Sequence, residues 1–102
     1  MKIPQSFELM GETITVEYST TLMLQGDSVG RACFETNTIQ LQENSKVFPR
    51  TKEQIRQTFL HEVIHFILIG MKQTDLNKNE NFVDTFANLL LQFEKSAKGE
   101  VK

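Results

Sequence analysis

The alternation of apolar and polar residues predicts two β-hairpins in the first half of the chain. Residues 6–9 and 13–18 place apolar side chains at every second position, with Gly11 at the turn between them. Residues 29–42 repeat this arrangement around a second turn. A period of two indicates strands with one buried side and one solvent-facing side. The segment between the hairpins, residues 20–24, fits a short helix or an irregular link.

The strand expected over residues 38–42 has a polar outer face. Its residues are Thr38, Ile39, Gln40, Leu41 and Gln42. A face rich in threonine and glutamine is tolerated at the edge of a sheet, where unpaired backbone N–H and C=O groups face solvent. We therefore expect this strand to form an edge of the sheet. Pro49 keeps the segment that follows it out of regular structure.

In the second half of the chain the apolar period changes to three and four residues, which predicts a long helix over residues 52–69. Its apolar stripe contains Ile55, Phe59, Val63 and Phe66. Thr51 and Gln54 have the spacing of a capping box, in which each side chain accepts a hydrogen bond from the other's backbone N–H. Gly70 stands where a left-handed residue is expected to end the helix.

A second amphipathic helix is predicted over residues 79–93. Asn77 and Glu80 have the spacing of a helix cap, with Asn77 as the capping residue. The apolar residues of this helix are Phe82, Val83, Phe86, Leu89, Leu90 and Phe93. We expect its phenylalanines to lie in the core. Residues 71–78 are expected to form a polar connection, and residues 94–102 a flexible tail.

These elements predict an α+β domain that spans residues 1–102. A small sheet of two hairpins, mainly antiparallel, occupies residues 6–42, and two packed helices follow it. With 102 residues, of which 39% are hydrophobic and 24% charged, the chain has the size and composition of one soluble globular domain.

Charge and apolar content restrict the classes of partner. A net charge of −2 argues against nucleic acid as the main partner, and the basic group within residues 46–56 is expected to be a solvated face. The start of the chain lacks the apolar run of a signal peptide. The longest apolar segment, residues 63–71, is interrupted by His65 and is too short to span a membrane. With Cys33 as its single cysteine, the chain is expected to be a cytoplasmic protein without an internal disulfide or a membrane partner.

The two histidines of the chain lie together on the first predicted helix. His61 and His65 are four residues apart, so they share one helix face and can reach the same metal ion. Glu62 follows the first histidine and completes the H-E-x-x-H pattern of zinc hydrolases. The pattern therefore predicts a Zn²⁺ site on this helix.

A catalytic zinc takes three protein ligands and keeps one position for water. The chain has no third histidine and only a single cysteine, so we expect a carboxylate as the third ligand. Glu80 is the candidate, since the fourteen residues between it and His65 allow a turn and an antiparallel return. The alternative is that Glu80 only complements the dipole of the second helix.

Two further carboxylates have expected roles beside the zinc ligands. Glu62 would take a proton from the zinc-bound water and pass it to the leaving amine. Asp84 shares a helix face with Glu80 and would accept a hydrogen bond from the second ring nitrogen of His61. A backbone carbonyl could orient His61 instead, and Asp84 would then be an ordinary solvated residue.

These motifs resemble those of known zinc peptidases. His61-Glu62-x-x-His65 followed by Asn79-Glu80-x-x-x-Asp84 resembles the gluzincins of thermolysin type. The continuation, Glu80-x-x-Val83-Asp84-x-Phe86-Ala87-x-x-Leu90, looks like the second helix of the ImmA/IrrE metallopeptidases of phages, mobile elements and their hosts. The compact layout is similar to that of the minigluzincins.

The resemblance implies a zinc-dependent endopeptidase that hydrolyses peptide bonds through a zinc-bound water. Its ligands would be His61, His65 and Glu80, with Glu62 as the general base. A peptide or protein substrate would pair as an extra strand with residues 38–42. Family members often add a tyrosine, histidine or arginine that stabilises the oxyanion, and no residue of this chain is assigned that role.

A second class of function uses the same fold without catalysis. The domain would then be a zinc-stabilised binding or regulatory module of a phage or mobile element. Glu62 favours the enzyme, because a purely structural zinc site is usually closed by four protein ligands and has no use for a general base. The sequence assigns neither a particular substrate nor an oligomeric state.

Overall fold

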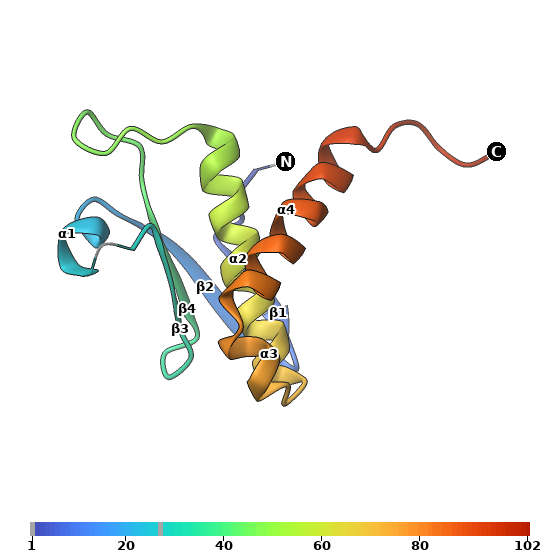
Figure 1. Ribbon diagram of the computed structural model, residues 1–102, viewed down its shortest axis with the longest axis horizontal. Helices are drawn as coiled ribbons and strands as arrows, with labels where there is room; N and C mark the ends of the chain where they lie inside the picture. Colours follow the sequence, from blue (N-terminus) through green and yellow to red (C-terminus); the bar gives the residue numbers. More distant parts are fainter. Residues whose placement is uncertain (1, 27) are drawn as a thin grey trace.

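A computed structural model of the chain describes residues 2–26 and 28–102 and confirms an α+β fold (Figure 1). The elements, in order, are β1 (Ser6–Leu9), β2 (Glu12–Ser19), α1 (Leu22–Gly26), β3 (Gly30–Cys33), β4 (Thr38–Gln42), α2 (Lys52–Gly70), α3 (Thr74–Lys78) and α4 (Glu80–Ser96). A four-stranded mixed sheet precedes the two main helices, which pack together. The segment between the hairpins contains a short helix, α1, one of the two alternatives that the sequence left open.

The strand order of the sheet is β1-β2-β4-β3. Both predicted hairpins form: β1 pairs antiparallel with β2, and β3 pairs antiparallel with β4. The hairpins join through a parallel pairing of β2 with β4, in which Val16 lies opposite Ile39. The first hairpin turns at Met10 and Gly11, whose φ angles of 54° and 76° are those of a two-residue turn.

The expectation that residues 38–42 form a sheet edge is wrong. These residues form β4, which pairs with β2 and therefore lies in the centre of the sheet. The edge strands of the sheet are β1 and β3. Gln42 is fully buried, and hydrogen bonds satisfy its side-chain amide. Its Oε1 accepts from the Met23 N–H (3.0 Å), and its Nε2 donates to the Thr20 carbonyl (3.1 Å). Gln40 donates to the Glu17 carboxylate on β2 (2.9 Å). The polar side chains of β4 therefore serve contacts with its neighbours.

Helix α2 begins where the capping box predicts. The Gln54 N–H donates to Thr51 Oγ1 (3.0 Å), and the Thr51 N–H donates to Gln54 Oε1 (2.9 Å). The end of the helix differs from the prediction, because Gly70 is its last helical residue. The left-handed residue is Lys72, with a φ of 59°, and the next N–H, that of Gln73, bonds back to the Leu68 carbonyl.

Helix α4 starts at a different cap from the predicted one and runs further. Asn79 is the capping residue, and its Oδ1 accepts from the Phe82 N–H (3.0 Å). Residues 74–78, expected within a polar connection, form α3. Helix α4 continues to Ser96, so the unstructured end of the chain begins at residue 97 rather than 94.

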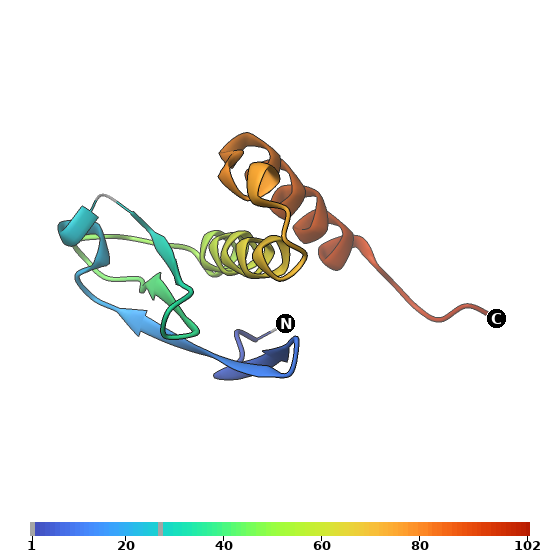
Figure 2. The same cartoon turned by 90° about the horizontal axis from the view of Figure 1, so that it is seen from below.

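The core lies between the sheet, α2 and α4, which form three successive layers (Figure 2). Helix α2 packs on β3 and β4 with one side and on α4 with the other. Its buried core residues include Phe59, Leu60, Ile64 and Phe66. Helix α4 buries Val83, Ala87 and Leu91.

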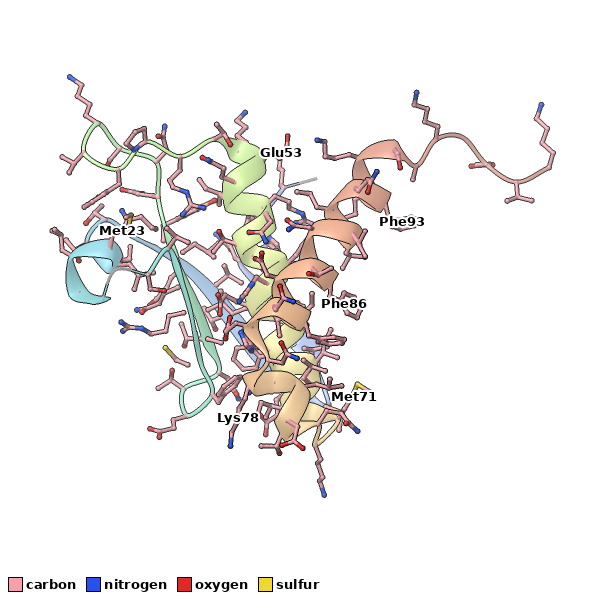
Figure 3. The ribbon with its side chains drawn as sticks, in the orientation of Figure 1. Met23, Glu53, Met71, Lys78, Phe86 and Phe93 are labelled. Atoms are coloured by element: carbon pink, nitrogen blue, oxygen red, sulfur yellow. The ribbon has the colours of Figure 1, made fainter. Side chains whose placement is uncertain are left out.

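Two of the three phenylalanines of α4 are not in the core. Phe86 and Phe93 are exposed, and Phe82 is partly buried. Figure 3 shows the side chains of Phe86 and Phe93 pointing away from α2. The smaller residues Val83 and Ala87 face α2 instead, which lets the two helices approach closely.

Candidate metal centre

The three predicted metal ligands lie together in the structure. Helix α2 places His61 and His65 on one face, with their Nε2 atoms 3.2 Å apart. Glu80, in the first turn of α4, reaches both rings: its Oε2 lies 3.0 Å from His61 Nε2 and its Oε1 3.3 Å from His65 Nε2. One ligand atom from each of the three residues lies within 4.8 Å of the other two.

The second ring nitrogens determine the chemistry of this cluster. Nδ1 of His65 lies 2.8 Å from Oδ1 of Asn77, and Nδ1 of His61 lies 3.5 Å from Oδ1 of Asp84. Both partner atoms are acceptors, so they favour a proton on each Nδ1, and each Nε2 would then present its lone pair to a metal. Two lone pairs and a carboxylate then converge on one point, which is a donor set for a cation.

The spacing of the ligand atoms fits zinc. Two nitrogens about 2.05 Å from a tetrahedral Zn²⁺ lie about 3.3 Å apart, close to the separation of the two Nε2 atoms. Two imidazoles and one carboxylate are also the ligand set of several catalytic zinc sites. The residues present therefore fit this metal.

Asp84 lies where the sequence predicts it, beside His61, and a second contact positions it. Nε2 of Gln57 donates to Asp84 Oδ1 (3.0 Å) from the preceding turn of α2. Asn77 and Gln57 were missed by the sequence reasoning. Asn77 carried a usable signal, because either asparagine of Asn77-Lys78-Asn79 can cap α4, and the one that does not cap is free to bond a histidine.

Glu62 is buried beside the histidines, with 7% of the residue exposed. Burial raises the pKa of its carboxyl, and the neighbouring Glu80 acts in the same direction, while His61 and His65 oppose the shift. Strand β3 passes close to this carboxylate at Gly30. A Cβ atom at position 30 would lie 2.9 Å from Glu62 Oε2 and would also meet Cγ2 of Thr58, so the close approach requires glycine.

These side chains line a cleft of about 370 Å³ between β3, α2 and α4. The lining residues are Ser28, Val29, Gly30, Gln57, Thr58, His61, Glu62, His65, Glu80 and Asp84. Tyr18, the only tyrosine, lines a different cavity with Lys2 and Lys52. Arg50 does not line the cleft, but it contacts a residue that does: its Nη2 donates to Thr58 Oγ1 (2.8 Å).

A comparison with known protein families decides the wider assignment. The model of the SprT-like family matches residues 5–97 of the chain. The chain belongs to the SprT-like family. No curated protein and no solved structure matches it significantly. The match does not support the resemblance to the ImmA/IrrE metallopeptidases.

SprT-like proteins are zincin-like metallopeptidases that carry the HExxH motif. In this SprT-like chain the motif is His61-Glu62-x-x-His65, and Glu80 completes a cluster that fits the metal site of such an enzyme. In the part of the chain that the structure describes, no helix combines the length and the apolar character needed to cross a bilayer.

Proposed function

We propose that this SprT-like chain is a zinc-dependent endopeptidase of gluzincin type. His61, His65 and Glu80 would hold the metal, and Glu62 would act as the general base. The observation that carries the proposal is the convergence of three metal-binding side chains and one buried carboxylate on a single cleft.

The protein residues divide the work of peptide hydrolysis. When bound, zinc supplies a Lewis acid that polarises the scissile carbonyl and lowers the pKa of a coordinated water to about 7. Glu62 accepts the proton of the attacking water and delivers it to the leaving amine. Because burial raises the pKa of Glu62, its carboxylate binds a proton more readily than an exposed one would.

Strand β3 replaces residues 38–42 as the proposed binding edge for the substrate. It pairs with β4 on one side only, and no other strand among the described residues covers its second side. Gly30 and the preceding residues 28–29 line the cleft. An extended peptide that adds to this edge would therefore run past Glu62 and the metal ligands.

The proposal is tested by cleavage of a broad peptide library by zinc-loaded protein, read by mass spectrometry. Wild type is expected to cleave peptides, and Glu62→Gln to lose at least about 100-fold in rate with unchanged zinc content. Glu8→Gln, which removes a carboxylate from the exposed face of β1, is expected to cleave like wild type. If wild type binds zinc but cleaves no more than Glu62→Gln, the domain is a non-catalytic zinc module.

A further inference from the structure

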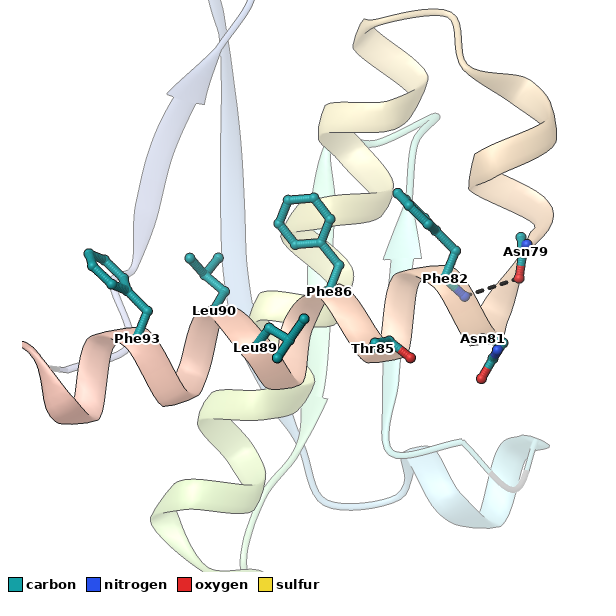
Figure 4. Close-up of a pocket in the computed structure, with 8 residues that line it drawn as sticks. All are labelled: Asn79, Asn81, Phe82, Thr85, Phe86, Leu89, Leu90 and Phe93. Atoms are coloured by element: carbon teal, nitrogen blue, oxygen red, sulfur yellow. Dashed lines mark hydrogen bonds between the residues drawn. The ribbon is translucent and has the colours of Figure 1, made fainter.

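Helix α4 has a second apolar face, most of which is exposed to solvent (Figure 4). Phe86, Leu89 and Phe93 are 46%, 61% and 64% exposed. Phe82 and Leu90 extend this face, and the rings of Phe82 and Phe86 meet edge to face with centroids 6.0 Å apart. Together they line a groove of about 670 Å³ on the surface of the helix. A contiguous apolar surface of this kind marks an interaction site.

The spacing of the apolar side chains on this face, of which Phe82 is partly buried, indicates what binds there. Phe82, Phe86, Leu89 and Phe93, which we call the α4 seam, follow one another at intervals of four, three and four residues. This is the spacing of the contact positions in a coiled coil. It reads the same in both directions along the helix. An antiparallel copy of the seam would therefore place Phe82 opposite Phe93 of the second copy, and Phe86 opposite its Leu89.

The polar residues beside the seam suit a copy of the same surface. Asn79, Asn81 and Thr85 line the groove with neutral amide and hydroxyl groups. Two identical surfaces that lack charge at their contact do not repel each other and desolvate no ion when they meet. Aromatic residues at the centre and few charges are also the composition of interface cores.

The size of the seam indicates a reversible contact. At about 200 Å² for a phenylalanine side chain, the exposed parts of Phe86 and Phe93 amount to roughly 220 Å², to which Leu89 adds about 100 Å². A standard interface buries about 800 Å² on each partner. The exposed apolar area of the seam is about two fifths of that value, so a weak and reversible contact is expected.

The seam lies on the side of α4 opposite the metal cleft. At about 100° per residue, Leu89 and Phe93 point roughly 180° away from Glu80 and Asp84. We propose that the α4 seam pairs with the seam of a second copy in an antiparallel arrangement. The result is a reversible two-fold dimer that leaves both metal clefts open to solvent.

Analytical ultracentrifugation of the wild-type chain from about 1 to about 500 µM tests the proposal. The average mass is expected to rise to twice that of the monomer. Phe86→Lys and Leu89→Glu should each weaken association at least about tenfold, since each places a charge in the seam. Asn88→Lys and Gln92→Glu add the same charges at exposed positions of α4 outside the seam, and should associate like wild type.

An equimolar mixture of Phe86→Lys and Leu89→Glu tests the antiparallel direction. The lysine introduced in one chain would then face the glutamate introduced in the other, and the dimer mass should return, which also shows that both variants are folded. A parallel pair would not restore the match, so failure of the mixture overturns the arrangement. A wild-type chain that stays monomeric over the whole range overturns the dimer, and so does wild-type-like association of Leu89→Glu.

Discussion

The two long helices that build the metal cleft are held in the fold in different ways. Helix α2 lies between the sheet and α4 and buries residues on both of these sides. Helix α4 packs on α2 and, apart from contacts with α3, on little else; it buries Val83, Ala87 and Leu91. Its opposite face, which contains the α4 seam, is exposed.

This difference divides the metal site between a firmly packed helix and a surface helix. His61 and His65 lie on α2, whereas the side chain of Glu80 is 69% exposed at the start of α4. A metal ion that joins all three residues would tie α4 to α2. A ligand that binds only the folded state stabilises that state, so zinc is expected to strengthen the contact between α4 and α2.

The largest expected effect is on the free energy of unfolding, when one phenylalanine from each helix is replaced by alanine. Phe59 on α2 is buried, with its ring 6.0 Å from that of Phe7 and under the Arg56 guanidinium. Phe59→Ala should lower the free energy of unfolding by about 3–5 kcal/mol. Phe93→Ala on α4 should change it by less than about 0.5 kcal/mol, because Phe93 is exposed. Urea denaturation of dilute protein measures the free energy of unfolding of each variant. Equal losses in the two variants would contradict the difference in packing between α2 and α4.

The contact between β3 and α2 gives the next largest effect. Gly30→Ala brings a Cβ atom against Thr58 and Glu62 and should cost about 1–3 kcal/mol of stability, together with slower peptide cleavage. Gly26→Ala is the matched control, since its Cβ would meet only Nη2 of Arg31 at an ordinary 3.7 Å. Wild-type stability and cleavage in Gly30→Ala would show that β3 is not tightly packed over Glu62.

The smallest effect concerns α3, which links the two helices. Asn77→Leu removes the acceptor for His65 Nδ1 and should weaken zinc binding about tenfold. Asn77→Asp retains an acceptor oxygen and should bind zinc at least as tightly as Asn77→Leu does. Competition with a chromophoric chelator measures the affinities. An unchanged affinity in Asn77→Leu would mean that His65 is oriented by other contacts.

Local signals predicted helix α2 of the cleft well. The start of α2 follows from Thr51 and Gln54, whose capping bonds involve residues three apart, and the ligand face follows from the helix period. These interactions depend on neighbours in the sequence, so the sequence shows them directly.

Features that depend on distant pairings could not be predicted in this way. Whether β4 lies at the edge or in the centre depends on its pairing with β2, and the polar side chains of Gln40 and Gln42 suggested the wrong answer. The face by which α4 packs was also predicted wrongly, because its phenylalanines were expected in the core and Phe86 and Phe93 are exposed. Its apolar arc is wide enough to offer either Val83 and Ala87 or Phe86 and Phe93 to α2, and only the packing selects one.

X-ray absorption at the zinc edge of the loaded protein tests the central claim, that α2 and α4 hold one zinc together. Wild type should show two imidazoles and oxygen ligands at about 2.0–2.1 Å, and Glu80→Gln should bind zinc about 100-fold more weakly through one fewer oxygen ligand. A sulfur ligand near 2.3 Å, which only Cys33 or a methionine could supply, would contradict the account. So would a spectrum and an affinity that Glu80→Gln leaves unchanged.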